Sequence, residues 1–327
     1  MNAKKIITVF GATGAQGGGL AHSMLEDRDG PFAVRAVTRD TTSSAARALA
    51  AAGAEVVAAD LDDAAAVARA LDGAFGAYFV TFYWAHFSPE RELAEARSLA
   101  QAARTAGLQH VIWSTLEDTR QLMAPDDKRM PFLQEKYRVP HFDAKAESNA
   151  FFAVLPVTFL MVSFYWDNLY MFGLAPKKDD KGVYSWAFPM GDAKLAGIAK
   201  DDIGKAAYGI FKAGSQYIGK TVAIAGEHLS FASMSDKLSK GLGIGPVKYT
   251  ALDADLFRSF GFPGANEYGN MFQMYRDFER QVNAVRSVEE TRKLTGGSLQ
   301  NFDEWLANNK AAVLAATNPA PAPATTT

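Results

Sequence analysis

A glycine-rich turn near the N-terminus constrains the fold of this chain more than any other segment. An apolar run over residues 6–10 leads directly into the turn, and a helix-like segment covers residues 16–25. Backbone amides at a helix N-terminus are unpaired and bind anions, while glycines let the backbone approach a pyrophosphate closely. A strand, a glycine turn and a helix in this order predict a dinucleotide-binding site. The residues expected to contact the cofactor here are Gly11, Thr13, Gly14, Ala15, Gln16 and Gly17.

The first half of the chain alternates strand-like and helix-like segments. Strand-like segments cover residues 6–10, 33–38, 55–58, 77–81, 111–114 and 158–164. Helix-like segments rich in Ala, Leu, Arg and Glu cover residues 18–26, 44–52, 64–71, 90–106 and 144–152. This alternation predicts an α/β fold, a Rossmann-type doubly wound parallel sheet with helices on both faces.

The alternation stops after residue 168, which predicts a smaller α+β lobe. We expect an NADP-binding domain over residues 1–165, a substrate or partner lobe over 166–315, some of whose segments return to the sheet, and a disordered tail over 316–327 rich in Pro, Ala and Thr. Residues 118–140 are charged, contain three prolines and have no clear period. A loop this long fits either a lid over the site or a surface excursion.

Composition excludes several classes of function. A net charge of −2 gives no electrostatic support for direct nucleic-acid binding. The absence of cysteine excludes disulfides and thiolate metal sites, and the five histidines are too scattered to predict a metal centre. The uncharged stretch 148–166 is interrupted by Pro156, so we expect a helix end and a buried strand there, not a membrane span. A cytoplasmic protein follows from these features.

The end of the second strand favours NADP over NAD. NAD-binding folds usually place an acidic residue here for the ribose 2′-hydroxyl, whereas this chain has Arg39, whose planar guanidinium can grip a 2′-phosphate. Asp40 could instead pair with Arg39 or contact the ribose. After the third strand, Asp60 and the backbone of Leu61 are placed to bond the adenine, although Asp60 could equally cap a helix.

With these residues placed, the sequence resembles the NmrA-like family, an atypical branch of the short-chain dehydrogenases/reductases, and within it the HSCARG-type NADPH sensors. The matching segments run from about residue 5 to residue 310. They are Val9-Phe10-Gly11-Ala12-Thr13-Gly14-Ala15-Gln16-Gly17-Gly18, Val37-Thr38-Arg39, Val80-Thr81, Tyr83-Trp84, Trp113-Ser114, His141-Phe142-Asp143-Ala144-Lys145, Gly191-Asp192, Asp202-Ile203-Gly204, Gly261-Phe262-Pro263-Gly264-Ala265 and Phe302-Asp303-Glu304-Trp305-Leu306.

The resemblance also implies where chemistry would occur. Active members of the superfamily use a serine on the fifth strand and a Tyr-x-x-x-Lys pair on the next helix, and here Ser114 and Lys145 are present while His141 replaces the tyrosine. His141 could donate the proton itself or be a surface residue near the helix start. Lys145 could act alone as acid or base, or only bind the cofactor ribose. Tyr137 and Tyr165 are other candidate donors.

Further cofactor contacts follow from the same comparison and from the positions of strand ends. They are Thr81 and Tyr83 after the fourth strand, Lys145 on the helix, and Tyr165 and Asn168 after the sixth strand.

A nearly complete cofactor site without the tyrosine favours a redox sensor or regulator that responds to the NADPH/NADP⁺ ratio and acts through a protein partner, with a homodimer as one possible state. The alternative is an NADPH-dependent reductase of a quinone, azo compound or similar acceptor, because such substrates need little acid assistance. A nucleotide-sugar epimerase or dehydratase fits less well, since those members normally retain the tyrosine. Whether the protein is an enzyme therefore depends on what replaces the tyrosine.

Overall fold

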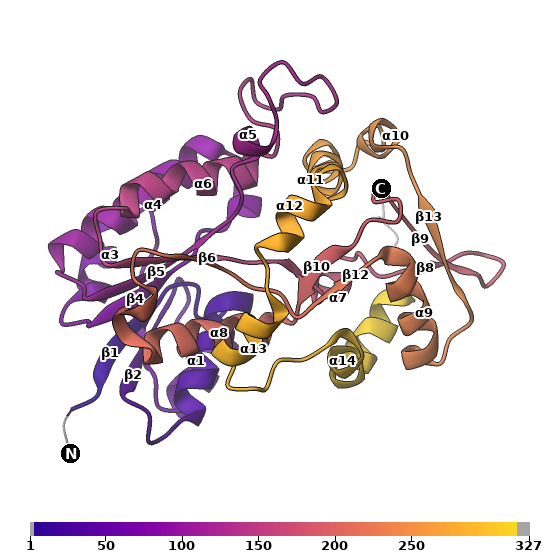
Figure 1. Ribbon diagram of the computed structural model, residues 1–327. Coiled ribbons are helices and arrows are strands. Elements are labelled where there is room, and N and C mark those ends of the chain that lie inside the picture. Colours follow the sequence, from indigo (N-terminus) through magenta and orange to yellow (C-terminus); the bar gives the residue numbers. More distant parts are fainter. Residues whose placement is uncertain (1–2, 319–327) are drawn as a thin grey trace, which may run out of the picture. The chain divides into compact units, whose positions relative to one another are not determined.

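Seven parallel strands form the central sheet of the computed structural model, which describes residues 3–318 (Figure 1). Their order is β11-β6-β5-β4-β1-β2-β3, and every pairing between neighbours is parallel. The strand order reverses direction between β1 and β4. In doubly wound folds, ligands bind at the carboxyl ends of the strands at such a reversal. The strands are β1 (Lys5–Val9), β2 (Phe32–Thr38), β3 (Glu55–Ala58), β4 (Gly76–Phe79), β5 (His110–Thr115), β6 (Val157–Met161) and β11 (Thr221–Ala223).

Helices cover both faces of this sheet, as the sequence predicts. Figure 1 shows α3 (Ala64–Leu71), α4 (Pro89–Thr105) and α6 (Pro140–Phe152) along one face, and α1 (Ala15–Glu26), α8 (Lys200–Lys212) and α13 (Val288–Leu294) along the other. Under α4 and α6 the core is apolar and tightly packed: the rings of Trp113 and Phe152 stack at 4.5 Å between centroids. The short α2 (Ser44–Ala51) follows β2, and α5 (Thr119–Leu122) follows β5.

The α1–α8 contact depends on glycine. A Cβ atom on Gly204 would lie 2.0 Å from the carbonyl carbon of Gly19 and 2.1 Å from the nitrogen of Leu20. The two helix backbones can approach this closely only because neither residue carries a side chain there. This contact fixes α8, which comes from far along the sequence, against the helix that begins at the glycine turn.

The chain divides into two compact units that are not continuous in sequence. Among the described residues, the first contains 3–163, 200–225 and 285–299, and the second contains 164–199, 226–284 and 300–318. The expected boundary at residue 165 lies close to the first crossing at 163/164, but the chain then returns to the first unit twice. The returning segments supply α8, β11 and α13.

The second unit contains two small sheets and several helices. One sheet has the order β12-β10-β7 and the other β13-β9-β8. Their strands are β7 (Phe164–Tyr165), β8 (Lys177–Lys178), β9 (Tyr184–Phe188), β10 (Leu195–Ile198), β12 (Glu227–Leu229) and β13 (Val247–Ala251). The helices are α7 (Asn168–Met171), α9 (Phe231–Leu242), α10 (Ala254–Arg258), α11 (Ala265–Asp277), α12 (Glu279–Ala284) and α14 (Phe302–Thr317).

Three expectations need correction. The strand expected over 158–164 ends at Met161, and Phe164 belongs to β7 of the second unit. Helix α6 begins at Pro140, four residues before the expected start, because proline fits the first turn of a helix. Residues 316 and 317 of the expected disordered tail lie in α14, and residues 319–327 lie outside the described residues. Over residues 3–318, no helix is both long and apolar enough to cross a membrane.

Candidate functional site

The glycine turn has the geometry of an anion cradle. Gly11 has φ +64°, and Gly14 is the N-cap of α1 without any side-chain cap. A Cβ atom on Gly17 would lie 2.5 Å from the carbonyl oxygen of Gly11, so only glycine fits there. The first turn of α1 therefore presents its backbone amides at the carboxyl end of β1, as a pyrophosphate requires. The side chain of Gln16 is buried, and its Oε1 accepts a hydrogen bond from the hydroxyl of Tyr78.

At the end of β2, Arg39 is exposed, and the carboxylate of its neighbour Asp40 is hydrogen-bonded within the loop. The carboxylate of Asp40 accepts hydrogen bonds from the amide of Thr42 at 2.8 Å and from its hydroxyl at 2.6 Å, and these bonds lower the pKa of Asp40. Ser43 caps α2 by accepting from the amide of Ala46. Among residues 3–318, no ion pair involves Arg39. Its guanidinium is thus available for a 2′-phosphate.

The end of β3 excludes one alternative reading of Asp60. The N-cap of α3 is Asp63, whose side chain accepts from the amide of Ala66. The side chain of Asp60 accepts from the nearby amide of Asp62, at 3.0 Å, and the residue is exposed. Asp60 is therefore not the helix cap, and both it and the half-buried Leu61 remain placed for an adenine contact.

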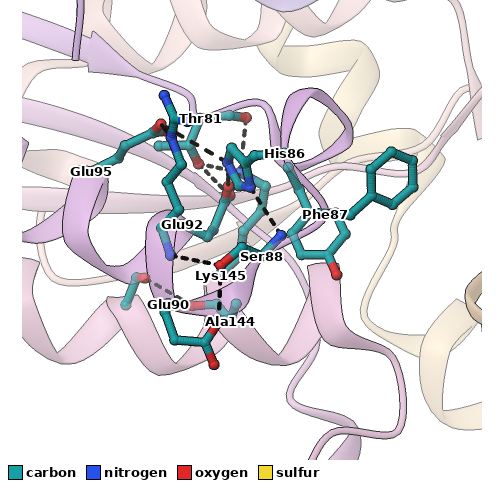
Figure 2. Close-up of polar contacts among 12 residues, drawn as sticks. Thr81, His86, Phe87, Ser88, Glu90, Glu92, Glu95, Ala144 and Lys145 are labelled. Carbon is teal, nitrogen blue, oxygen red and sulfur yellow. Dashed lines mark hydrogen bonds and ion pairs between the residues drawn. The ribbon is translucent and has the colours of Figure 1, made fainter. Parts of the chain in front are cut away.

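Lys145 and Thr81 come together where β4 ends. The ammonium of Lys145 donates to the hydroxyl of Thr81 at 2.6 Å and to its carbonyl at 3.1 Å. A third residue, Glu92 of α4, lies 2.7 Å from the same ammonium through Oε1 (Figure 2). Burial alone would raise the pKa of Glu92, but Lys145, His86 and Thr81 outweigh it and lower that pKa to about 2. The result is a buried ion pair at the carboxyl edge of the sheet.

Ser114 lies near the end of β5, the strand next to β4. Its side chain is 1% exposed, and its hydroxyl has no hydrogen-bond partner among the described residues. Buried hydroxyls are almost always paired, so an unpaired one at a ligand-binding edge is consistent with a contact to a bound molecule. The resemblance marks three positions for chemistry, Ser114, His141 and Lys145. Of these, Ser114 and Lys145 are both buried polar groups near the carboxyl ends of the central strands.

His141 is not a surface residue, contrary to the simpler of the two expectations. It is 6% exposed, and its ring lies 4.7 Å from that of Trp84 and 5.8 Å from that of Tyr83. Tyr83 itself is buried, and its hydroxyl accepts a hydrogen bond from Gln134 at 3.2 Å. His141 therefore stands in an aromatic cluster at the start of α6, and Tyr83 is part of that cluster.

The segment 118–140 is folded around two buried polar side chains. Arg138 donates to the carbonyls of Met130, Pro125 and Asp127. Asp143 of α6 accepts from the amide and hydroxyl of Thr119 and from the amide of Arg138. Burial raises the pKa of Asp143 against these hydrogen bonds.

Three other predicted residues are Tyr137, Tyr165 and Asn168. The hydroxyl of Tyr137 donates to Glu147, near the middle of α6, at 3.4 Å. Tyr165 in β7 and Asn168 at the start of α7 belong to the second unit. The Oδ1 of Asn168 is buried and has no hydrogen-bond partner among the described residues.

The sequence analysis did not identify Glu92 or two residues close to its carboxylate, His86 and Glu95. The oxygen Glu92 Oε2 lies 3.6 Å from Nε2 of His86, and Oε1 of Glu95 lies 3.9 Å from the same nitrogen. A signal for Glu92 is present in the sequence. It precedes Ala96 and Leu99 by four and seven residues, which places a carboxylate on the apolar face of a predicted helix.

Comparison with known proteins agrees with this geometry. Residues 3–306 match the NmrA-like family. The NmrA-like family domain-containing oxidoreductase malD of Malbranchea aurantiaca is 26% identical, over 93% of this chain and 96% of its own length. The oxidoreductase FrzB of Cladobotryum sp, of the same description, is 30% identical over 66% of this chain and 67% of its own.

Solved structures share the fold. NmrA, described as a negative transcriptional regulator, was solved in complex with NADP and superimposes with a TM-score of 0.75 at 24% identity, covering 94% of this chain and 95% of its own. NmrA was also solved with NAD. The triphenylmethane reductase of Citrobacter sp., complexed with NADP(H), has a TM-score of 0.70 at 19% identity, covering 93% of this chain and 99% of its own. NADP, the cofactor predicted from the sequence, is thus bound in two structures of this fold. From the match over residues 3–306, this chain belongs to the NmrA-like family.

Proposed function

We propose that this protein binds NADP(H) through the glycine turn and Arg39 and reduces a small-molecule acceptor. The cradle fits a dinucleotide, because the first turn of α1 has no side-chain cap and Gly17, where a Cβ would collide with the backbone of Gly11, lets the helix start pack directly on the turn. Arg39 is free to hold the 2′-phosphate that distinguishes NADP from NAD. When bound, the reduced nicotinamide would supply a hydride.

The observation that carries the proposal is a buried hydroxyl without a partner among the described residues, Ser114 near the end of β5, together with a buried ammonium, Lys145 of α6, held where β4 ends. Ser114 can donate a hydrogen bond to an acceptor oxygen. Lys145 holds a proton and a positive charge, which stabilise negative charge that develops on the acceptor. The oxidoreductases malD and FrzB, similar to this chain over most of its length, support the same reading.

The missing tyrosine limits the choice of substrate. With His141 packed against Trp84, the chain has no tyrosine at the usual position to protonate a carbonyl. Quinones, azo compounds and cationic triarylmethane dyes accept hydride without strong acid assistance. We therefore infer that the acceptor belongs to this group of compounds rather than to simple aldehydes or ketones.

A second candidate is a redox regulator that binds NADP(H) without turnover. It is favoured by one observation: the three contacts of the Lys145 ammonium to Glu92 and Thr81 engage it within the chain. A regulator would need the cofactor site, but it would not need a Lys145 ammonium that is free to contact a substrate. The two candidates share NADP(H) binding and differ only in turnover.

The test is an assay of NADPH oxidation against quinones, azo dyes, a triarylmethane dye and aldehydes, with NADPH binding measured in parallel. We expect turnover with at least one of the first three classes, and a loss of about 100-fold in Lys145→Ala and about 10-fold in Ser114→Ala. Lys240→Ala, a change of an exposed lysine in α9, serves as the control and should leave turnover unchanged. Tight NADPH binding without oxidation of any acceptor would refute the reductase and favour the regulator.

A further inference from the structure

Glu92 faces Lys145 in the interior of the first unit. Its side chain is fully buried in the first turns of α4, and Lys145 is 7% exposed on α6. Figure 2 shows the two side chains pointing toward one another, with Thr81 beside them. Removing either charge alone would leave the other buried without a partner, which is strongly unfavourable.

Glu92 and Thr81 together use every proton of the ammonium. A lysine ammonium has three N–H donors. One lies against Glu92 Oε1 at 2.7 Å, one against the hydroxyl oxygen of Thr81 and one against its carbonyl. The hydroxyl of Thr81 in turn donates to Glu92 at 2.5 Å. The three residues form a closed network that fixes the position of Lys145.

The other oxygen of Glu92 faces His86 and, through it, Glu95. Nδ1 of His86 accepts from the amide of Ser88 at 3.1 Å, so the ring proton is on Nε2, which points at both carboxylates. Separations of 3.6 and 3.9 Å are too long for hydrogen bonds. Burial and then the charge of Glu92 raise the pKa of Glu95.

His86, Glu92 and Glu95 are residue types that bind metal ions. Both carboxylates, however, already have cationic partners within the chain. Lys145 pairs with Glu92, and Nε of Arg91 lies 3.3 Å from Glu95. A divalent cation would have to share Glu92 with the ammonium at close range. The arrangement is thus better explained by its lysine than by a metal.

We propose, building on the cofactor site of the proposed function, that Glu92 is a positioning residue that keeps Lys145 charged and fixed beside Thr81. In the superfamily's usual arrangement the lysine acts on a tyrosine, whereas here a carboxylate is its partner. Lys145 then serves as a permanent cation, not as a base, with its three N–H groups held by Glu92 and Thr81. This role fits a site that stabilises negative charge on an acceptor without a tyrosine acid.

The charge state of Lys145 in the Glu92→Gln variant tests the proposal. The substitution keeps the shape of the side chain but removes the counter-ion, and desolvation then favours the neutral amine. The groups that face the pair are Glu92, Glu95 and Arg91 on α4, Lys145 on α6, and His86 in the segment before α4, with Asp62 paired to Arg91. Only the first of these changes in the variant.

The readout is the pH dependence of amine acetylation at Lys145 in the cofactor-free protein, followed by peptide mass spectrometry. A neutral amine reacts and an ammonium does not. At pH 7 we expect at least 10-fold faster labelling of Lys145 in Glu92→Gln than in the wild type. Glu92→Asp should restore slow labelling. Glu90→Gln, a change of an exposed glutamate two residues away that bonds Ser88, should match the wild type.

Three results would overturn the proposal. One is a folded Glu92→Gln protein whose Lys145 labels as in the wild type. Another is equal acceleration in Leu99→Ala, which loosens the core under α4 without changing charge, because local opening would then explain the labelling. The third is stoichiometric zinc binding by the wild type that is lost in His86→Ala, which would make the cluster a cation site.

A second arm measures NADPH affinity from pH 6 to pH 9. Glu92→Gln should bind like the wild type at pH 6 and about 10-fold more weakly at pH 9, with no such slope in the wild type. Affinity that is equally weak at every pH would indicate a merely structural role and would count against the proposal. If the wild type bound no NADPH, the proposed function would fail, while the labelling result would still decide the role of Glu92.

Discussion

Arg286 and Glu117 form a buried ion pair in the first unit. The guanidinium of Arg286 has no exposed surface, and Nη1 donates to Oε1 of Glu117. Its Nε donates to the hydroxyl of Ser163 at 3.1 Å, and its Nη2 donates to the carbonyl of Val162 at 2.9 Å. Glu117 follows β5 and Ser163 follows β6, so one side chain joins the returning segment 285–299 to two strand ends.

Replacing Arg286 by methionine should unfold the protein more easily. The variant keeps most of the volume of the side chain but leaves the carboxylate of Glu117 buried without a cation. We expect a loss of about 3–5 kcal/mol in the free energy of unfolding, measured by urea denaturation. Arg280→Met, at an exposed position of α12, is the matched control and should change it little. A loss below about 1 kcal/mol in Arg286→Met would contradict the assignment of this ion pair as a stabilising element.

Adding one methyl group at Gly204 should destabilise the α1–α8 contact. The new Cβ would fall 2.0 Å from the backbone of Gly19, so the helices would have to separate. We expect a loss of about 3 kcal/mol and a melting temperature lowered by several degrees. Gly245→Ala adds the same methyl group where no atom lies within 4 Å, and its melting temperature should stay near that of the wild type. Equal stability of the two variants would mean that α1 and α8 pack less closely than described.

Local sequence patterns predicted most of the first unit. The strand over residues 55–58 and the helix over 64–71 have the expected bounds, because alternating apolar strands and alanine-rich helices carry a strong periodic signal. Gly53 and Gly107, which follow the ends of α2 and α4, both have positive φ, as residues that end helices often do. The short strands β8, β10 and β12 were not predicted, since two to four residues contain too little periodicity to stand out from loops.

The candidate site was predictable only where a motif is local. The glycine turn and Arg39 lie within one βαβ unit, so their spacing is visible in the sequence. Glu92 and Arg286 act through partners 53 and 169 residues away, and no local pattern links them to Lys145 or Glu117. Such pairs depend on which strands and helices become neighbours, which only the folded chain determines.

The preference for NADP should depend on Arg39. Its exposed guanidinium has no ion-pair partner among residues 3–318, and a charge-assisted contact to a 2′-phosphate contributes about 1.5–3 kcal/mol. Arg39→Ala should therefore weaken NADP binding by roughly 10- to 100-fold and NAD binding far less, as measured by calorimetry or fluorescence. Arg28→Ala changes another exposed arginine of the first unit and should affect neither. An equal loss for both cofactors in Arg39→Ala would disprove the 2′-phosphate contact.

Stability should fall on acidification through the protonation of His110. Burial lowers the pKa of His110 from 6.5 to about 4. Its Nε2 lies 3.0 Å from the hydroxyl oxygen of Thr158, whose own proton is donated to the carbonyl of Tyr217, so the neutral ring donates here. Between these two pH values the unfolded chain binds a proton that the folded chain does not, and the free energy of unfolding therefore rises with pH across this window.

The loss from pH 7 to pH 4 should reach about 3 kcal/mol at most, because each unit of pKa difference corresponds to about 1.4 kcal/mol. His110→Gln keeps a donor for Thr158 but cannot ionise, so urea unfolding of this variant should depend less on pH between 6.5 and 4. His22→Gln, at an exposed histidine, should retain the wild-type slope. The depressed pKa of Glu92 acts in a lower window, since its stabilisation is lost only as pH falls from about 4.5 toward 2. A wild-type slope in His110→Gln would show that other groups cause the acid sensitivity.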